Sequence, residues 1–373
     1  MAVSAPSPRV LTRAGRVRRV STRPMSRLTG HELTQSYTGL AQTVRSEGLQ
    51  RRTLGFYGLV LGCLVLALGG AVTGFILLEH SWLQLLIAAA LGLILTQFAF
   101  LGHEASHRQI FTSGPANDRV GRLLATGVVG ISYSWWMSKH NRHHANPNKI
   151  GRDPDVEMDT ISFLEENAAT RTGFLAWLTR HQGTLFFPLL LLEGINLHQA
   201  SFLSLVRTRP DRSRTAELAL LVGRIGGYLT VLFLVLPVGL AFAFLGVQLA
   251  VFGLYMGASF APNHKGMPIV PRTVKLDFLT KQVRTSRNIR GGWWATALMG
   301  GLNYQIEHHL FPSMPRPHLA RARILVRAYC REHGVPYTET SLLESYGIVI
   351  RYLNRVGLSA RDPFDCPLAT SLR

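Results

Sequence analysis

The stretch LTVLFLVLPVGLAFAFLGVQLAVFGLYMG, residues 229–257, contains no charged side chain. The uncharged region around it runs from residue 225 to residue 262, and residues 54–78 and 81–102 are uncharged as well. A helix needs about 20 apolar residues to cross a bilayer, so each shorter stretch predicts one span. The longest stretch predicts two spans, at about 219–241 and 247–262, with a break near residues 246–248. The sequence therefore predicts an all-α integral membrane protein with four transmembrane helices in two hairpins.

The basic residues indicate which side of the membrane the polar segments occupy. Residues 1–53 hold ten Arg and two acidic residues, whereas the predicted hairpin loops, around 79–80 and 245–248, hold no Lys or Arg. By the positive-inside rule the N-terminus is cytoplasmic, and four spans return the C-terminus to the same side. The intervening segment 103–216 and the chain after residue 263 then form a cytosolic helical cap. We expect the apolar residues 185–205 of this cap, which include Glu193 and Asn196, to lie in the membrane interface.

The formal net charge of +19 bears on the partners of the chain. Its basic residues flank the predicted spans without a nucleic-acid-binding motif, so we expect contacts with anionic membrane lipids and none with nucleic acid. The three cysteines form no CxxC pair, which fits a reducing compartment. The excess of Arg over Lys favours a GC-rich genome and hence a bacterial plasma membrane.

We divide the chain into three parts. Residues 1–53 form a basic cytoplasmic N-terminal segment, whose first 30 residues have the composition either of a basic tail or of a transit peptide. Residues 54–330 form the membrane domain, and residues 331–373 form a cytoplasmic C-terminal tail.

Seven of the 14 histidines fall into three clusters on the predicted cytoplasmic side, and His264 follows the fourth predicted span. The clusters are HEASH at 103–107, HNRHH at 140–144 and QIEHH at 305–309. Residues three or four apart share one face of a helix, so we expect the histidines within each cluster to point to one place. Solvated helix ends would explain one such pair, but not three clusters on one side. The candidate ligands of a metal site are His103, His107, His140, His143, His144, His264, His308 and His309.

The number and type of these ligands limit the choice of metal. Zinc sites use three or four protein ligands, and structural zinc sites are rich in Cys. Eight imidazoles without a nearby thiol favour two metal ions, and imidazole suits iron, copper, nickel and zinc. The absence of a thiol or flavin motif beside a lipid-facing site indicates oxygen chemistry.

The three clusters, in this order, resemble the histidine boxes HxxxH, HxxHH and [HQ]xxHH of the membrane fatty acid desaturase family. The resemblance continues in HHANPNKIGRDPDVE at 143–157, APNHKG at 261–266 and GLNYQIEHHLFP at 301–312, and covers about residues 54–330. It implies four spans under a cytosolic cap that holds two histidine-bound irons. The implied activity introduces a double bond into a fatty acyl chain, carried on coenzyme A or in a lipid, and uses O2 and two electrons.

Residue by residue, the resemblance makes the eight candidate histidines iron ligands. Asn263, beside His264, is then a candidate to hold a water. Gln305 replaces the first histidine of the third box, as in front-end and some bacterial acyl-lipid or acyl-CoA branches. Residues 1–53 are too short for the cytochrome b5 domain of many front-end members and lack its HPGG haem motif. We therefore expect electrons from a separate carrier, a ferredoxin or a flavin reductase.

Several neighbouring side chains are further candidates. A carboxylate can orient a ligating histidine ring, or it can lie at the surface or cap a helix. His198 is either close to the metals or structural, and two tryptophans either line an acyl tunnel or belong to an aromatic belt. The carboxylates are Asp153, Asp155, Glu157, Glu104 and Glu307, and the tryptophans are Trp135 and Trp136.

Two alternative functions stay open at this stage. A fatty acyl hydroxylase would share the scaffold, because both reactions begin by removing one hydrogen. A membrane metal carrier would need polar groups along its spans, and the predicted spans are nearly bare of them.

Overall fold

The computed structural model describes residues 30–157, 160–209 and 211–360. Its elements are, in chain order, α1 (Gly30–Ser46), α2 (Leu54–Leu77), α3 (Gln84–Ser106), α4 (Gly114–Arg122), the π-helix η2 (Leu123–Val129), α5 (Tyr133–Ala145), α6 (Glu165–Ala169), α7 (Gly173–His181), α8 (Phe186–Leu190), α9 (Glu193–Arg207), α10 (Arg212–Val235), α11 (Val238–His264), α12 (Phe278–Arg284), β1 (Asn288–Ile289), α13 (Gly292–Leu298), the 3-10 helix η3 (Leu302–Tyr304), α14 (Gln305–Leu310), α15 (Arg316–Glu332), β2 (Glu339–Thr340) and α16 (Leu342–Leu358). The strands β1 and β2 pair in parallel over two residues each. The predicted all-α class is confirmed.

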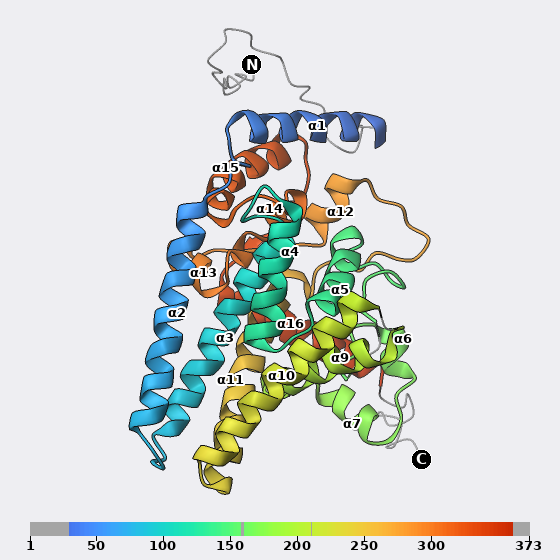
Figure 1. Cartoon of the computed structure of the whole chain (residues 1–373). Helices are drawn as coiled ribbons and strands as arrows, with labels where there is room; N and C mark the ends of the chain where they lie inside the picture. The colour runs from blue at the N-terminus through green and yellow to red at the C-terminus, as the bar shows by residue number, and fades with distance from the viewer. Residues whose placement is uncertain (1–29, 158–159, 210, 361–373) are drawn as a thin grey trace, which may run out of the picture.

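Four helices, α2, α3, α10 and α11, are long and apolar enough to cross a membrane. They form two hairpins, α2–α3 and α10–α11 (Figure 1). Helices α3 and α11 pack against each other in the interior. Helices α2 and α10 expose most of their apolar side chains, which suits helices that face lipid. The four predicted spans are confirmed.

The turn of the second hairpin lies earlier in the chain than expected. The predicted break at 246–248 is wrong, because α11 continues through these residues as one helix of 27 residues. The break falls at Pro237, whose ring and missing N–H cannot continue α10. The spans therefore end at Val235 and begin again at Val238, not at 241 and 247. At 1.5 Å per residue, α11 is about 40 Å long, enough to cross the bilayer and carry His264 beyond it.

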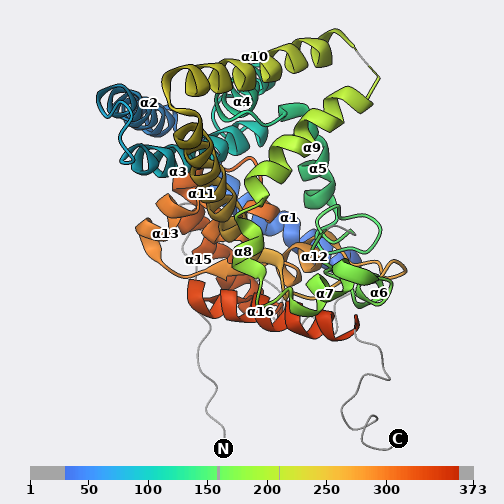
Figure 2. The same cartoon turned by 90° about the horizontal axis from the view of Figure 1, so that it is seen from below.

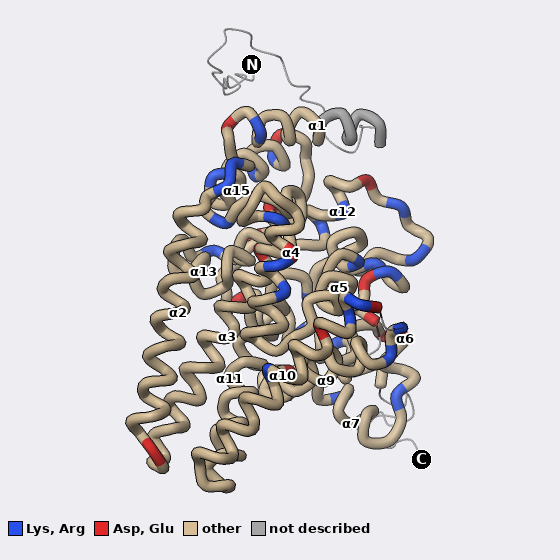
Figure 3. Tube along the Cα trace, in the orientation of Figure 1, with Lys and Arg blue, Asp and Glu red and all other residues tan. Residues whose placement is uncertain are grey.

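The other helices form a cap that covers one end of the spans and extends down one side of them (Figures 1 and 2). Helices α1, α12, α14 and α15 lie at the end, and α5, α6, α7 and α9 lie along the side. Lys and Arg gather over α1, α15, α12 and nearby loops, whereas the opposite ends of the spans are almost free of charge (Figure 3). By the positive-inside rule the basic end faces the cytoplasm, and this orientation stays a prediction.

Both ends of the described chain are packed into the cap. Leu40 and Val44 of α1 are buried in one core with Val326 of α15. In α16, Val349 and Leu353 share another core with α8. The predicted domain boundaries at residues 53 and 330 therefore do not coincide with gaps in the packing. Residues 1–29 and 361–373 of the predicted terminal segments lie outside the described residues.

The segment expected in the membrane interface forms α8 and α9, which are not among the four spanning helices. Helix α9 exposes Ile195, Phe202 and Val206 along one side, while Leu197 and Leu205 on another side are buried. An exposed apolar face on a helix beside the spans suits a helix that lies in the interface. That these residues do not form a spanning helix is confirmed, and their place in the interface stays a prediction.

Candidate metal centre

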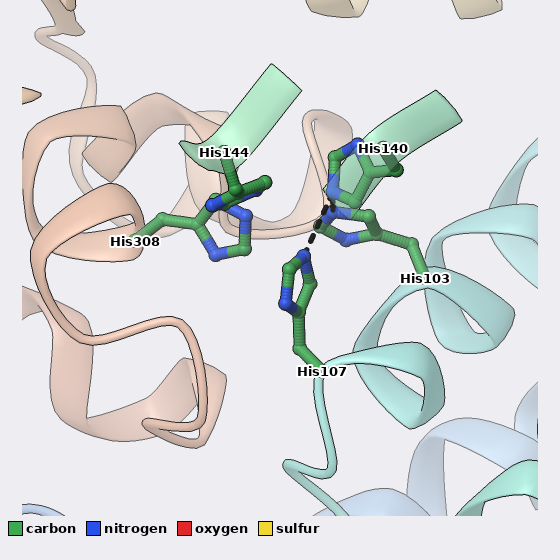
Figure 4. Close-up of side chains that lie close together, drawn as sticks. All are labelled: His103, His107, His140, His144 and His308. Carbon is green, nitrogen blue, oxygen red and sulfur yellow. Dashed lines mark hydrogen bonds between the residues drawn. The ribbon is translucent and has the colours of Figure 1, made fainter. Parts of the chain in front are cut away.

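Five histidines from three helices form the first buried group (Figure 4). His103 lies in the last turn of α3 and His107 caps its C-terminal end. His140 and His144 come from α5, and His308 comes from α14. The Nε2 atom of His140 lies 2.9 Å from Nε2 of His103 and 2.8 Å from Nε2 of His107. The coordinating nitrogens thus converge on one place.

Three further histidines form a second group beside the first. His264, at the end of α11, places its Nε2 atom 3.3 Å from Nε2 of His143 and 3.1 Å from Nε2 of His309. The side-chain amide of Gln305 lies 2.9 Å from the same His264 nitrogen. All eight candidate histidines therefore belong to one group or the other, and Gln305 lies at the second.

The two groups share helices, which corrects one expectation from the sequence. Each box was expected to point to a single place, but α5 sends His140 and His144 to the first group and His143 to the second. Residues i and i+4 lie about 40° apart around a helix, whereas i+3 lies on the other side of i. The short helix α14 likewise divides His308 and His309 between the groups.

Hydrogen bonds orient the rings of the second group. The Nδ1 atom of His143 lies 3.0 Å from Oδ1 of Asp153. The other two rings place Nδ1 2.9 Å from a protein oxygen, His264 against the carbonyl of Thr285 and His309 against Oε1 of Gln282. A partner on Nδ1 fixes the ring and leaves Nε2 aimed at the centre of the group. Sequence reasoning missed Gln282 and Thr285, because neither belongs to a motif and one acts only through its backbone.

The nitrogen positions fit metal ions. Two nitrogens bound at about 2.1 Å and at right angles to each other lie about 3.0 Å apart, close to the separations in both groups. Among the described residues, both ring nitrogens of His144 and Nε2 of His308 are buried without a hydrogen-bond partner. Buried polar atoms normally have partners, so these orphaned nitrogens indicate ligands of an ion. The buried histidine groups are thus suited to hold metal ions.

Burial also sets the protonation state of the rings. It lowers the pKa of His107 to about 3 and holds the pKa values of His140, His144, His308 and His309 well below the usual range. These rings are therefore neutral near pH 7, the form that binds metals. His143 differs, because burial lowers its pKa but Asp153 and Asp155 together raise it.

Only two of the five candidate carboxylates contact a ligand ring. Asp153 is fully buried against His143, and Asp155 lies 3.4 Å from the same ring and 3.1 Å from Lys139. Glu157 is half-exposed and pairs with Arg142 at 3.2 Å.

The other two carboxylates act at a distance from the rings. Glu104 makes a buried two-pronged ion pair with Arg316, and Glu307 accepts hydrogen bonds from Asn288 and Tyr337 at 2.7 and 2.9 Å. HEASH also fits HExxH, the zinc-protease pattern in which the glutamate is a general base. Because Glu104 is held by Arg316, it cannot take that role here.

His198 does not join either group. Its Nδ1 lies 2.7 Å from the carbonyl oxygen of Gly194, and its ring packs on Phe252, so its role is structural. Asn263 lies at the second group, where its amide donates to Oε1 of Gln305 at 3.2 Å. The Oδ1 atom of Asn263 is buried without a partner among the described residues, which leaves it available to a water or an ion.

A cavity of about 310 Å³ opens beside both groups. His140 of the first group and His143 and His264 of the second line it, and Trp136 stacks on His140 with the ring centroids 4.9 Å apart. Trp135 lines a neighbouring hollow instead. The other apolar side chains of the cavity wall include Ile161, Phe163, Phe186, Leu189, Leu190, Met256 and Phe260.

Four apolar spans and two buried histidine groups beside an apolar cavity define a helical membrane metalloprotein. The model of the family "Fatty acid desaturase" matches residues 80–341, and the chain belongs to this family. It is 28% identical to a Delta(8)-fatty-acid desaturase of Helianthus annuus over 356 residues, covering 89% of this chain and 75% of the relative. The identity is 28% to an acyl-lipid (9-3)-desaturase of Borago officinalis, over 78% of this chain and 68% of the relative. It is 26% to a Delta(6)-fatty-acid desaturase of Caenorhabditis elegans, over 87% and 75%. The chain is therefore an oxidoreductase of lipid metabolism, a fatty acid desaturase.

Proposed function

We propose that this desaturase uses two iron ions held by the eight histidines to introduce a double bond into a fatty acyl chain, with O2 as co-substrate. The observation that carries the proposal is the division of the box histidines into two adjacent buried groups at one cavity. When bound, the irons supply the oxidising power that no amino-acid side chain has for an unactivated methylene.

The ligand assignment follows the two groups. The first iron takes His103, His107, His140, His144 and His308, and the second takes His143, His264 and His309. Gln305 and Asn263 stand at the second site, where the third box has one imidazole fewer. Asp153 orients His143, and Asp155 supports it from the cavity side.

The side chains of the cavity position the acyl chain and exclude water. Trp136 packs flat against His140, so the wall is continuous from the apolar interior to the first group. An extended acyl chain in this cavity passes beside ligands of both groups. Exclusion of water from the bound acyl chain also prevents side reactions.

The remaining partners follow from the topology. We expect the active site and both termini on the cytoplasmic side. Anionic lipids would meet there the Lys and Arg of the cap (Figure 3). Electrons come from a separate ferredoxin or flavin reductase. The relatives named above are eukaryotic and do not support a bacterial origin. The bacterial plasma membrane therefore stays a prediction that rests on the excess of Arg over Lys alone.

Expression of the chain in a host, followed by gas chromatography and mass spectrometry of its fatty acids, tests the proposal. We expect a new unsaturated fatty acid, which His144→Ala abolishes while the protein still reaches the membrane. Purified protein should contain close to two irons per chain. A hydroxy acid without an alkene would contradict the desaturase reaction, and firmly bound zinc in place of iron would contradict the metal assignment.

A further inference from the structure

We propose that the acyl chain reaches the active site from the bilayer as part of a membrane lipid with a zwitterionic head group, and not as a coenzyme A thioester. This inference rests on the proposed desaturase function and concerns only the group that carries the acyl chain. It follows from the position of the cavity opening and from the charges around it.

The cavity wall and the lipid-facing surface meet at the start of α9. Leu189, Leu192 and Leu197 line the cavity, while Leu192 is also 58% exposed and Ile195, one turn further on, is 51% exposed. The apolar stripe of α9 continues to Val206. One helix thus separates the acyl cavity from the membrane interface, so an acyl chain can pass between them without crossing water.

A second hollow of about 340 Å³ continues the cavity toward the surface between α5 and α9. It shares Lys139, Glu157, Glu193 and Asn196 with the cavity, and adds Arg142 and two serines. The position of this polar hollow, outside an apolar cavity, suits the head group of a substrate whose acyl chain lies within.

The charges that line the two hollows cancel. The cations are Lys139, Arg142 and Lys265, and the carboxylates are Asp155, Glu157 and Glu193. The ion pairs are already formed, since Lys139 lies 3.1 Å from Asp155 and Arg142 lies 3.2 Å from Glu157.

Lys265 is also engaged within the cavity. Its Nζ atom donates to the carbonyl oxygen of Asp155 at 2.5 Å and lies 3.7 Å from the centre of the Phe163 ring. Each of the three cations of the lining therefore already contacts a carboxylate, a carbonyl oxygen or an aromatic ring among the described residues.

Coenzyme A carries several phosphates, and a site for such a polyanion needs an excess of Lys and Arg. The lining has none, although the protein as a whole carries +19. A zwitterionic head group has one phosphate and one ammonium, and a lining with equal numbers of cations and carboxylates complements both. The charge balance at the opening therefore favours the lipid carrier.

The test supplies the same acyl groups on two carriers. Iron-loaded protein receives electrons from NADPH, ferredoxin reductase and ferredoxin, and acts either on phosphatidylcholine vesicles or on coenzyme A thioesters. Each carrier bears palmitoyl, oleoyl or linoleoyl chains, and the products are quantified by mass spectrometry. We expect product from phosphatidylcholine at a rate at least about tenfold above that from the thioester, the difference made by roughly 1.4 kcal/mol.

Failure of the inference and failure of the function give different results. Product from the thioester alone, or equal rates on both carriers, would overturn the lipid carrier and leave the desaturase intact. No product on either carrier, from protein that holds its irons, would overturn the function as well.

A charge variant adds an independent readout. In Glu157→Lys/Glu193→Lys the opening gains positive charge, and we expect KM for phosphatidylcholine to rise about tenfold while turnover of the thioester increases. The control Glu166→Lys/Glu332→Lys makes the same charge change at exposed positions that line neither hollow. Equal effects in the two variants would mean that overall charge decides, and would refute the argument from the opening. If the first variant loses its irons, the carrier comparison on the unchanged protein decides alone.

Discussion

Replacing Asp153 by Asn tests how much the second histidine group depends on its orienting carboxylate. The Asp153 side chain is fully buried and accepts from His143 Nδ1, from Asn148 N at 2.7 Å and from Asp155 N at 3.0 Å. Asparagine keeps the shape but turns one accepting oxygen into a donor, so at least one buried N–H loses its partner. That loss costs about 1–3 kcal/mol, which is roughly a 5- to 150-fold change in equilibrium constant. The range agrees with the roughly 10- to 100-fold effects of losing a partner of a ligating histidine.

The assay for Asp153→Asn measures iron as well as activity. A chelator competition should show one iron bound about 10- to 100-fold more weakly, with the other unchanged, and turnover should fall in parallel. Asp211→Asn is the matched control, because Asp211 caps α10 with a side chain that is 60% exposed, and Asn caps helices equally well. Unchanged affinity for both irons in Asp153→Asn would refute the reasoning. Equal weakening of both irons would refute the assignment of Asp153 to one group.

Three further predictions concern stability. Gly253→Ala should lower the free energy of unfolding by about 1–3 kcal/mol, because a Cβ there would lie 2.3 Å from the backbone nitrogen of Gly194. In the control Gly257→Ala, the new Cβ meets the flexible side chain of Leu190. Thermal unfolding in detergent compares the two variants, and equal midpoints would contradict the prediction. Arg316→Met should lower the free energy of unfolding by about 3–5 kcal/mol, because it leaves Glu104 buried without its partner. The double variant Glu104→Gln/Arg316→Met should recover much of this loss. A double variant as unstable as Arg316→Met would show that the loss comes from packing and not from charge. Metal-free protein should unfold more easily as the pH falls from about 6.5. Burial lowers the pKa of buried rings such as His107, so the unfolded chain binds more protons than the folded one. Each such ring lowers the free energy of unfolding by up to about 1.4 kcal/mol per pH unit. Burial raises the pKa of Glu307 to about 7, and Asp153 and Asp155 raise the pKa of His143, so these groups oppose the trend. The rings whose pKa is lowered outnumber them, so a higher unfolding midpoint at pH 5 than at pH 7.5 would contradict the prediction.

Much of the architecture could be predicted because the bilayer imposes length and composition on each span. The first hairpin was predicted to within a few residues, since its loop contains the charged Glu79. The second turn was misplaced because Gly246 and Gln248 resemble a loop, yet Gly is tolerated within an apolar helix. The residue that interrupts the helix is Pro237, whose ring and missing N–H cannot continue it.

In the site, too, the features that depend on local sequence could be predicted, and those that depend on contacts between distant segments could not. Box spacing identifies seven of the eight histidines that converge, and His264 follows from the resemblance; neither could show that His143 and His144 belong to different groups. That outcome depends on where α11 and α14 end relative to α5, which is set by tertiary packing. The role of Thr285 could not be predicted either, because it uses a backbone carbonyl that every residue has.

The division of α5 between the two groups has a mechanical consequence. His140 and His144 leave this helix on one side and His143 leaves it on another. A rotation of α5 about its axis that brings one set of nitrogens closer to its metal must carry the other set sideways. In the proposed two-iron centre the angle of α5 is therefore a compromise between two sets of ligands, and a substitution that rotates this helix should disturb both sites, whereas one that changes the partner of a single ring should disturb only one.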